Sequence, residues 1–257
     1  MQGAGRMGEK MLGELGLEKN GCTAFIGAGG KTTAVYCCVR ESRQRGFLAA
    51  AVTTTKMWKP KEGFLEWRES LSIEEIRKQI RAYGTFPLTI GTDLGNGKTG
   101  PIPDPALALL VKAGVRLFVE SDGARGKWIK TPGTNEPVVP DVTDTVVGIL
   151  NQRALGHSFW EVAHRPSICA DRLGKKPEDL VEMEDLLSLF LHGDGIFQNC
   201  RMKKTALVSG FQMGEGRCFY ARYRNEFQKM RQQGIPAFLW ERSDDRQSIF
   251  AADEGII

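Results

Sequence analysis

A glycine-rich turn followed by a lysine and two threonines is the strongest chemical signal in the sequence. Its residues are Gly27, Ala28, Gly29, Gly30, Lys31, Thr32 and Thr33. They follow an apolar run, Cys22–Ile26, and open a segment with helical periodicity, so the pattern predicts a strand, a turn and a helix. Glycines let the backbone approach phosphate oxygens, free amides at a helix N-terminus point at the anion, and Lys31 supplies positive charge. We expect nucleotide phosphates to bind here, with the Thr32 hydroxyl available to Mg²⁺.

The spacing departs from the standard phosphate-loop motif G-x-x-x-x-G-K-[ST], because that motif needs a glycine where this chain has Phe25. The shorter pattern G-x-x-G-K-T-T resembles the phosphate loop of the Mur-type ligases. A glycine-rich turn with an incidental lysine is the alternative interpretation.

Two carboxylates, Glu120 and Asp122, close another apolar run that ends in Leu117-Phe118-Val119. Because they are two residues apart, they share one face of an extended strand. Phosphate-loop enzymes keep a carboxylate at such a strand end, where it holds the Mg²⁺ shell or orients water. We expect Asp122 to hold Mg²⁺ together with Thr32, Glu120 to position the attacking water, and Arg125 to meet developing negative charge.

Three threonines and a lysine, Thr53–Lys56, follow a third apolar run. All strand carboxyl ends of a parallel sheet open on one edge, and ligands bind in that crevice. Hydroxyls of Thr54 and Thr55 would therefore contact phosphate, metal or water. A β-branched strand end with polar caps is an equally good interpretation.

Apolar runs without polar alternation recur along the chain and are separated by helical patterns. This arrangement predicts an α/β fold similar to the P-loop NTPases, with a mainly parallel sheet flanked by helices. The pattern divides the chain into a polar N-terminal segment (1–21), a nucleotide-binding core (22–151), a mostly helical insertion (152–201) and a return to the sheet (202–257).

Several local expectations accompany this fold. Residues 86–90 are expected to form a strand and 219–233 one helix. Met7, Met11, Leu12 and Leu15 form a helical stripe near the N-terminus. Burial in a core is favoured for most of Trp58, Trp67, Trp128 and Trp160.

Composition excludes several classes of protein. With 41% hydrophobic and 26% charged residues, the chain is neither disordered nor collagen-like. A formal net charge of +4 is too small to make nucleic acid the expected partner. The longest apolar runs are too short to cross a membrane, and no secretion signal is seen, so a cytoplasmic location with reduced cysteines is expected. Eight Lys/Arg and two Asp/Glu between Arg201 and Arg231 indicate a solvated helix face or a contact with an acidic partner or phosphate.

Taken in this order, the motifs resemble the selenium-dependent molybdenum hydroxylase accessory proteins, the YqeC family. The resemblance continues through ESDGARG (120–126), Lys130, NEPVVP (135–140) and HRP (164–166). Gly27, Gly29, Gly30, Lys31, Thr32 and Thr33 match the phosphate loop of that family, and Glu120, Asp122 and Arg125 match its acidic motif. Glu136 and His164 match further characteristic positions.

The resemblance implies Mg²⁺-dependent binding of ATP or GTP, nucleoside triphosphatase activity, and a part in maturing a selenium-dependent hydroxylase through a molybdenum-cofactor-related ligand. A Mur-like ATP-dependent ligase and a non-hydrolysing, nucleotide-gated cofactor carrier or chaperone are the alternatives. Where a base-reading motif is expected, the chain has Leu207-Val208-Ser209-Gly210-Phe211, so the choice between ATP and GTP stays open.

The segment 123–140 is long for a connection between strands, and such loops are commonly functional. It carries the cations Arg125, Lys127 and Lys130 beside Trp128. Together with His164 and Arg165, it is expected to form a second pocket that faces Lys31 and takes a phosphorylated substrate. A surface loop with solvated cations is the alternative.

Overall fold

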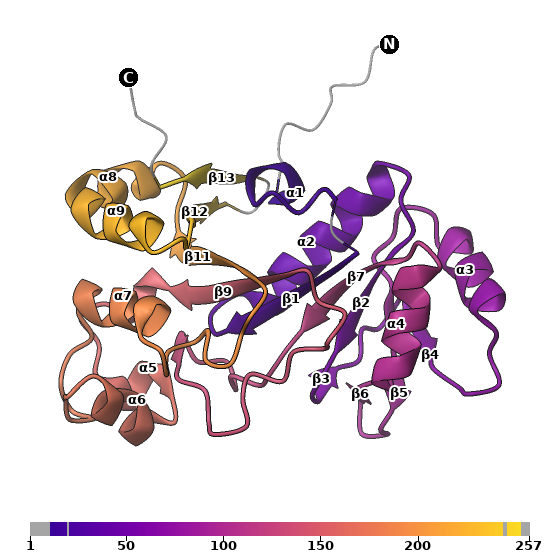
Figure 1. The fold of residues 1–257 in the computed structure, drawn as a ribbon, viewed down its shortest axis with the longest axis horizontal. Helices are drawn as coiled ribbons and strands as arrows, with labels where there is room; N and C mark the ends of the chain where they lie inside the picture. Colours follow the sequence, from indigo (N-terminus) through magenta and orange to yellow (C-terminus); the bar gives the residue numbers. More distant parts are fainter. Residues whose placement is uncertain (1–10, 20, 244–245, 253–257) are drawn as a thin grey trace, which may run out of the picture.

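A large twisted β-sheet runs through the middle of the protein (Figure 1). The computed structural model describes residues 11–19, 21–243 and 246–252. Seven neighbouring strands are parallel, in the order β12 (Ala237–Arg242), β11 (Lys203–Phe211), β9 (Thr145–Asn151), β1 (Cys22–Gly27), β7 (Arg116–Glu120), β2 (Ala49–Thr53) and β5 (Thr89–Asp93). The expected α/β class with a mainly parallel sheet is confirmed.

Short strands extend this sheet at both edges. At one edge β13 (Gln247–Ala251) pairs antiparallel with β12. At the other edge β5 pairs antiparallel with β6 (Lys98–Gly100), β6 pairs antiparallel with β3 (Met57–Trp58), and β4 (Phe64–Glu66) runs parallel to β5. A separate two-stranded parallel sheet joins β8 (Ile129–Lys130) to β10 (Ala163–His164).

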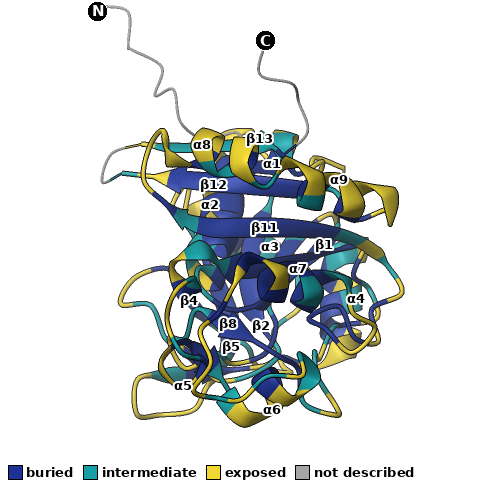
Figure 2. Ribbon diagram, turned by 90° about the vertical axis from the view of Figure 1, so that its left-hand side faces the viewer, coloured by how far each residue is buried: buried dark blue, intermediate teal, exposed yellow. Residues whose placement is uncertain are grey.

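Helices cover both faces of the sheet. On one face lie α1 (Met11–Glu14) and α2 (Lys31–Gln44), which pack on side chains such as Phe25 and Ile149. The other face packs against the remaining longer helices: α3 (Ile73–Ala82), α4 (Asp104–Lys112), α6 (Pro166–Arg172), α7 (Met183–Leu191), α8 (Glu215–Arg222) and α9 (Arg224–Gln232). Successive strand side chains point to opposite faces, so strands covered on both faces are apolar throughout. Figure 2 shows these strands as a buried layer.

Residues 152–201 contain the 3-10 turn η1 (Gln152–Ala154), the short helix α5 (Phe159–Val162), β10, α6 and α7. The pairing of β10 with β8 connects this segment to the chain that follows β7. No helix in the described part of the chain is long and apolar enough to cross a membrane.

Some local expectations were wrong. The single helix expected over 219–233 is two helices, because Tyr223 adopts a non-helical backbone (φ −115°, ψ 27°) between α8 and α9. The strand expected at 86–90 begins only at Thr89. The expected core burial of most of the four tryptophans was wrong: Trp58 and Trp160 have exposed fractions of 73% and 53%, and Trp67 and Trp128 are only partly buried. Met7 lies outside the described residues, whereas Met11 and Leu12 are buried in α1.

The turn after β1 predicts a strong dependence on Gly27. Its φ is +86°, and a Cβ there would lie 2.2 Å from the carbonyl oxygen of Ile149. Gly114 has a similar φ of +80° but no atom within 4 Å of its Cβ position, which makes it a matched control. We expect Gly114→Ala to cost about 1–2 kcal/mol of unfolding free energy through backbone strain alone, and Gly27→Ala to cost at least about 2 kcal/mol more. Urea unfolding of the two variants measures the difference, and equal losses would show that the loop does not need this close approach.

Candidate functional site

The glycine-rich loop lies at the carboxyl edge of the sheet, between β1 and the start of α2. Its Ala28 N–H donates to the Ile149 carbonyl at 2.8 Å, and the Ser209 hydroxyl donates to the Gly29 carbonyl. A Cβ at Gly29 would lie 2.4 Å from the Cβ of Asn151. The loop is therefore pressed against the ends of β9 and β11. The first N–H groups of α2 have no acceptor within the helix, as at any helix N-terminus, and they open towards this edge.

Lys31 begins α2 and turns back under the loop. Its Nζ donates to the Gly27 carbonyl at 2.6 Å and lies 3.5 Å from Oδ1 of Asp122, and the side chain is almost fully buried. Burial lowers the pKa of the Lys31 ammonium from its usual value, and the Asp122 carboxylate opposes that shift. In this structure the lysine is paired within the protein and still borders the cleft above it.

Thr32 lies on the cleft side of α2, and its hydroxyl donates to Oε2 of Glu120 at 2.6 Å. The end of β2 meets the same point, because the Thr53 hydroxyl and the Thr54 N–H donate to the Glu120 carbonyl at 2.9 and 3.2 Å. The Thr55 N–H donates to the Thr53 hydroxyl. The Thr54 hydroxyl is buried without a hydrogen-bond partner. The structure thus brings the three sequence motifs together at one edge.

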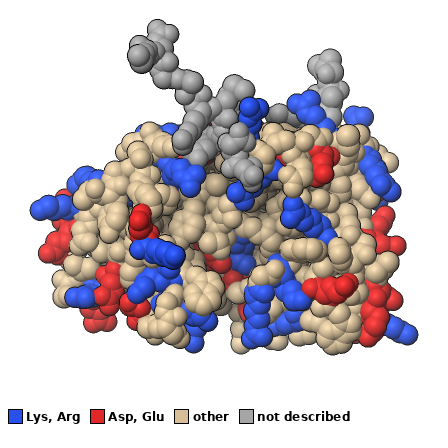
Figure 3. All heavy atoms as spheres, turned by 180° about the vertical axis from the view of Figure 1, so that it is seen from behind, with Lys and Arg blue, Asp and Glu red and all other residues tan. Residues whose placement is uncertain are grey.

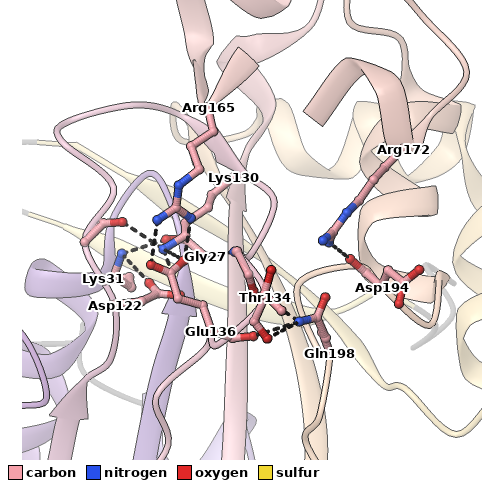
Figure 4. A network of polar contacts seen from close by, with 12 residues as sticks. Gly27, Lys31, Asp122, Lys130, Thr134, Glu136, Arg165, Arg172, Asp194 and Gln198 are labelled. Carbon is pink, nitrogen blue, oxygen red and sulfur yellow. Dashed lines mark hydrogen bonds and ion pairs between the residues drawn. The ribbon is translucent and has the colours of Figure 1, made fainter. Parts of the chain in front are cut away.

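Asp122 is buried between two lysines, Lys31 and Lys130. Its Oδ2 is 3.1 Å from Nζ of Lys130, which also lies 2.8 Å from Oε2 of Glu136 and donates to the Gly123 carbonyl at 2.9 Å. The Arg165 guanidinium binds both Glu136 oxygens, at 2.6 and 2.8 Å. Lys31, Asp122, Lys130, Glu136 and Arg165 thereby form a chain of alternating charge, which we call the buried ion network (Figure 4).

Burial and ion pairing act in opposite directions inside the buried ion network. Burial raises the pKa of the Asp122 carboxyl, while Lys31 and Lys130 work to lower it. The Arg165 guanidinium holds the pKa of Glu136 well below its usual range, with Lys130 contributing. Burial, aided by the positive charges of Lys130 and Arg165, lowers the pKa of the neighbouring His164 to about 4. His164 is therefore a neutral imidazole at pH 7.

A cleft of about 880 Å³ opens above the loop. Its charged lining comprises Lys31, Lys56, Lys59, Lys98, Arg125, Lys127, Arg153, Arg242 and a single acid, Glu120. Figure 3, which views the molecule from behind, shows lysine and arginine side chains gathered around a hollow in the lower middle of the visible face. Eight cations against one acid give the cleft a strongly positive lining, although Lys31 is paired with Asp122 and Lys59 with Asp93.

The cleft also shows where sequence reasoning was incomplete. The segment after Asp122 does reach the cleft, because Arg125, Lys127 and Trp128 line it together with the glycine-rich loop. The expected second pocket is not a separate one here: Lys130 and Arg165 are bound to carboxylates in the buried ion network, and neither they nor His164 line the cleft.

Residues that the motifs did not identify complete the lining. Asn151, Arg153, Gln212, Trp240 and Arg242 come from β9, β11 and β12 or the residues directly after them, and Lys59 and Lys98 lie at β3 and β6. The rule that strand carboxyl ends share one edge applies equally to the first group and would have pointed to it.

Thr32, Glu120 and Asp122 carry the oxygens that would hold a divalent cation; Thr32 and Glu120 line the cleft, whereas the Asp122 carboxylate is buried and does not line it. Oδ1 of Asp122 is buried and accepts no hydrogen bond, but the Lys31 ammonium lies 3.5 Å from it, so this atom would bind a cation only if Lys31 moved away. Among the described residues, no three His, Cys, Asp or Glu side chains gather as metal ligands. Mg²⁺ is commonly held by one or two carboxylates completed by phosphate oxygens and water, so the Thr32, Glu120 and Asp122 oxygens fit a cation that arrives with a phosphate.

Fold and site together define an α/β protein whose glycine-rich loop, between the central strand and a helix, faces a strongly cationic cleft. Residues 23–167, more than half of the chain, match the family model described as YqeC protein, and the chain therefore belongs to the YqeC family. It is 27% identical over 193 residues to a protein of Escherichia coli strain K12 described as uncharacterized protein YqeC, with 72% of this chain and 74% of the relative covered. No solved structure matches the chain.

The matched range contains the whole buried ion network and the three motifs. The part of the cleft that β11 and β12 supply, including Gln212 and Arg242, lies outside it.

The buried ion network predicts a large cost for removing its central cation. Lys130→Met leaves Asp122 and Glu136 without their shared partner, and breaking a buried ion pair costs about 3–5 kcal/mol. Lys127→Met is the matched control, since its Nζ donates to the Glu161 carbonyl at an exposed position, and a change there is expected to stay within about 1 kcal/mol. Guanidinium unfolding measures both. Similar losses in the two variants would contradict a structural role for Lys130.

His164 gives a pH-dependent prediction. Its pKa of about 4 lies below the ordinary value of 6.5, so the folded state favours the neutral ring. The resulting stabilisation is complete above pH 6.5 and is lost as the pH falls towards 4. We expect the ring protons of His164 to titrate near pH 4 in an NMR experiment, with His164→Gln used to assign the signal. A midpoint above 6 would show that burial and the neighbouring cations do not act on this ring.

Proposed function

We propose that the protein binds a Mg²⁺-complexed nucleoside triphosphate, ATP or GTP, in the cationic cleft and hydrolyses it slowly. We propose further that this step serves the maturation of selenium-dependent molybdenum hydroxylases, through a molybdenum-cofactor-related ligand. The observation that carries the nucleotide proposal is the position of Lys31 and the start of α2, below a cleft with eight cations and one acid.

Each group of the loop has a task in phosphate binding. Backbone amides at the start of α2 would donate to phosphate oxygens, and the positive end of the helix adds to the attraction. The Lys31 ammonium would leave the Gly27 carbonyl to bind the terminal phosphates. The buried Asp122 carboxylate would keep Lys130 as its partner during that movement.

Hydrolysis needs a positioned water and compensation of developing charge. Mg²⁺, held by Thr32 with Asp122 or Glu120, would supply positive charge between the terminal phosphates. Glu120, which lines the cleft, would accept a hydrogen bond from the attacking water; the Thr54 hydroxyl is buried, and neither Thr54 nor Thr55 lines the cleft. Arg125 lines the cleft and has a strained backbone (φ 49°), which places its guanidinium group as the candidate to meet charge that builds up on the leaving phosphate.

The accessory role rests on family membership and on the resemblance of the motifs. The segment from Glu120 to Arg165, which carries the motifs shared with the accessory proteins, supplies one wall of the cleft and the whole buried ion network except Lys31. A role in a maturation pathway is consistent with a nucleotide cleft large enough for a further ligand.

One observation favours a second candidate function, a non-hydrolysing carrier whose shape is set by bound nucleotide. Asp122 is already neutralised by Lys31 and Lys130. If Asp122 keeps both partners when nucleotide is bound, it holds no metal. Nucleotide binding without hydrolysis would then change the conformation of residues 123–165 through the buried ion network.

Calorimetry with Mg-ATP and Mg-GTP tests the proposal on the wild type and on Lys31→Met and Thr32→Val. We expect Lys31→Met to weaken binding by about 10- to 150-fold, because a charge-assisted hydrogen bond contributes about 1.5–3 kcal/mol. Since Lys31 is buried against Asp122, the unfolding free energy of the Lys31→Met variant is measured separately. Thr32→Val keeps the shape of the side chain and is expected to weaken the Mg²⁺-dependent part of binding only.

Lys78→Met, on the exposed face of α3, is the matched control and should bind like the wild type. Wild-type binding of neither nucleotide, or unchanged binding in both loop variants, would contradict the proposal. Phosphate release without an acceptor supports hydrolysis, release that depends on an acceptor indicates a ligase, and binding without turnover indicates the carrier.

A further inference from the structure

The cleft has two ends that lie on opposite sides of the glycine-rich loop. One end is formed where β9, β11 and β12 finish, by Arg153, Gln212, Trp240 and Arg242. The other end is formed by the chain that follows β2 and by the antiparallel pair β3–β6, with Lys56, Trp58, Lys59 and Lys98. The strand order places β1 between these two groups of strands.

The position of Glu120 orients a bound triphosphate between the two ends. Glu120 and its partner Thr32 mark the place of the terminal phosphate, because a metal-binding or water-positioning carboxylate must lie beside it. Glu120 ends β7, and β7 lies next to β2 on the β3–β6 side of the loop. The nucleoside would therefore extend the other way, towards Arg153 and Trp240. The β3–β6 end would remain open beside the terminal phosphate.

This open end carries cations that the triphosphate does not need. The cleft lining has a surplus of seven positive charges, and a triphosphate with Mg²⁺ neutralises only part of it. Lys59 is already paired with Asp93 at 2.5 Å. Lys56 and Lys98 have no ion-pair partner among the described residues, and Arg125 lines the same cleft.

An exposed aromatic side chain stands among these cations. Trp58 is 73% exposed although it lines the cleft, and Nζ of Lys98 lies 5.2 Å from the centre of its ring. Trp58 and Lys98 are held opposite each other in the β3–β6 ladder, and the Lys59 N–H donates to the Gly97 carbonyl at 2.9 Å beside them. Both side chains therefore stand on paired strands, which position a binding site better than free loops do.

We propose that Lys56, Trp58 and Lys98 form a second ligand subsite, which takes an anionic ligand with a planar ring and binds it at the same time as the nucleotide. The lysines bind the anionic group, and the ring stacks on Trp58, whose exposed face it removes from water. That the two ligands lie side by side rests on the proposed nucleotide function. The subsite itself rests on the lining of the cleft.

Flavin mononucleotide is a suitable probe, because it joins a planar ring to a phosphate, and riboflavin is the same ring without the phosphate. Binding is followed by quenching of flavin fluorescence in the presence and absence of saturating Mg-ATP. Trp58 is exposed and Lys98 is half-buried, and unfolding curves of Trp58→Ala and Lys98→Gln check that both variants keep the fold. Trp160→Ala removes a tryptophan that is also exposed but lies outside the cleft lining, and it is the matched control.

The proposal expects saturable binding of flavin mononucleotide to the wild type, with Mg-ATP bound as well and with riboflavin at least about tenfold weaker. It expects Trp58→Ala and Lys98→Gln each to weaken binding about tenfold, as loss of one aromatic stacking partner or one charged contact does. Trp160→Ala should bind like the wild type.

Three results would overturn the proposal: no binding of flavin mononucleotide, binding that is unchanged in both subsite variants, or one-for-one displacement of the flavin by Mg-ATP. Failure of the nucleotide function gives a different pattern. In that case no nucleotide binds to the wild type, while flavin binding persists in Lys31→Met and still depends on Trp58 and Lys98.

Discussion

The buried carboxylate of Asp122, held between Lys31 and Lys130, is the interaction on which the rest of the site depends. Without it Lys31 would have no ion-pair partner in the buried ion network, and an unpaired charge in the interior costs several kcal/mol, whereas Lys130 also pairs with Glu136. One lysine belongs to the helix after the glycine-rich loop and the other to β8, far along the chain. Asp122 thus joins the phosphate site to the segment that carries Glu136 and Arg165. Gln198 extends the connection, since its amide donates to the carbonyls of Gly133, Thr134 and Glu136 (Figure 4).

The same network accounts for the unusual backbone around it. Asp122, Arg125 and Arg165 all have positive φ angles, of 62°, 49° and 62°, a region that side chains other than glycine avoid at a cost of about 1–2 kcal/mol each. Such residues persist where the surrounding contacts over-determine them. Here Lys31 and Lys130 hold Asp122, Glu136 holds Arg165, and Arg125 lies between Asp122 and Arg165 in the chain with its side chain at the cleft. These backbone conformations lower the stability of the fold, and they position the charged side chains of Asp122, Arg125 and Arg165.

The sequence predicts well the residues of the glycine-rich loop and the carboxylate beside it. It does not predict the pairing of Lys130 or the β3–β6 end of the cleft. Long apolar runs such as Cys22–Ile26 identify the parallel strands, and the common carboxyl edge then brings Lys31, Thr32 and Glu120 together without further information. The pairing of Lys130 with Asp122 depends on how the irregular segment between them, residues 123–129, folds back, for which no periodicity gives a signal. Trp58 and Lys98 stand on strands of two and three residues, which are too short for an alternating pattern to show.

The contacts of the glycine-rich loop also determine when it is completed during synthesis. The loop and α2 leave the ribosome early, but the Ser209 hydroxyl that bonds to the Gly29 carbonyl is made 180 residues later. At about 5–20 residues per second, that interval is on the order of 10–40 s. Throughout it the nascent chain has β1 and the loop without β11, the strand that closes one side of the cleft. The finished cleft therefore exists only in a nearly full-length chain, and a truncated translation product would lack one wall of the site.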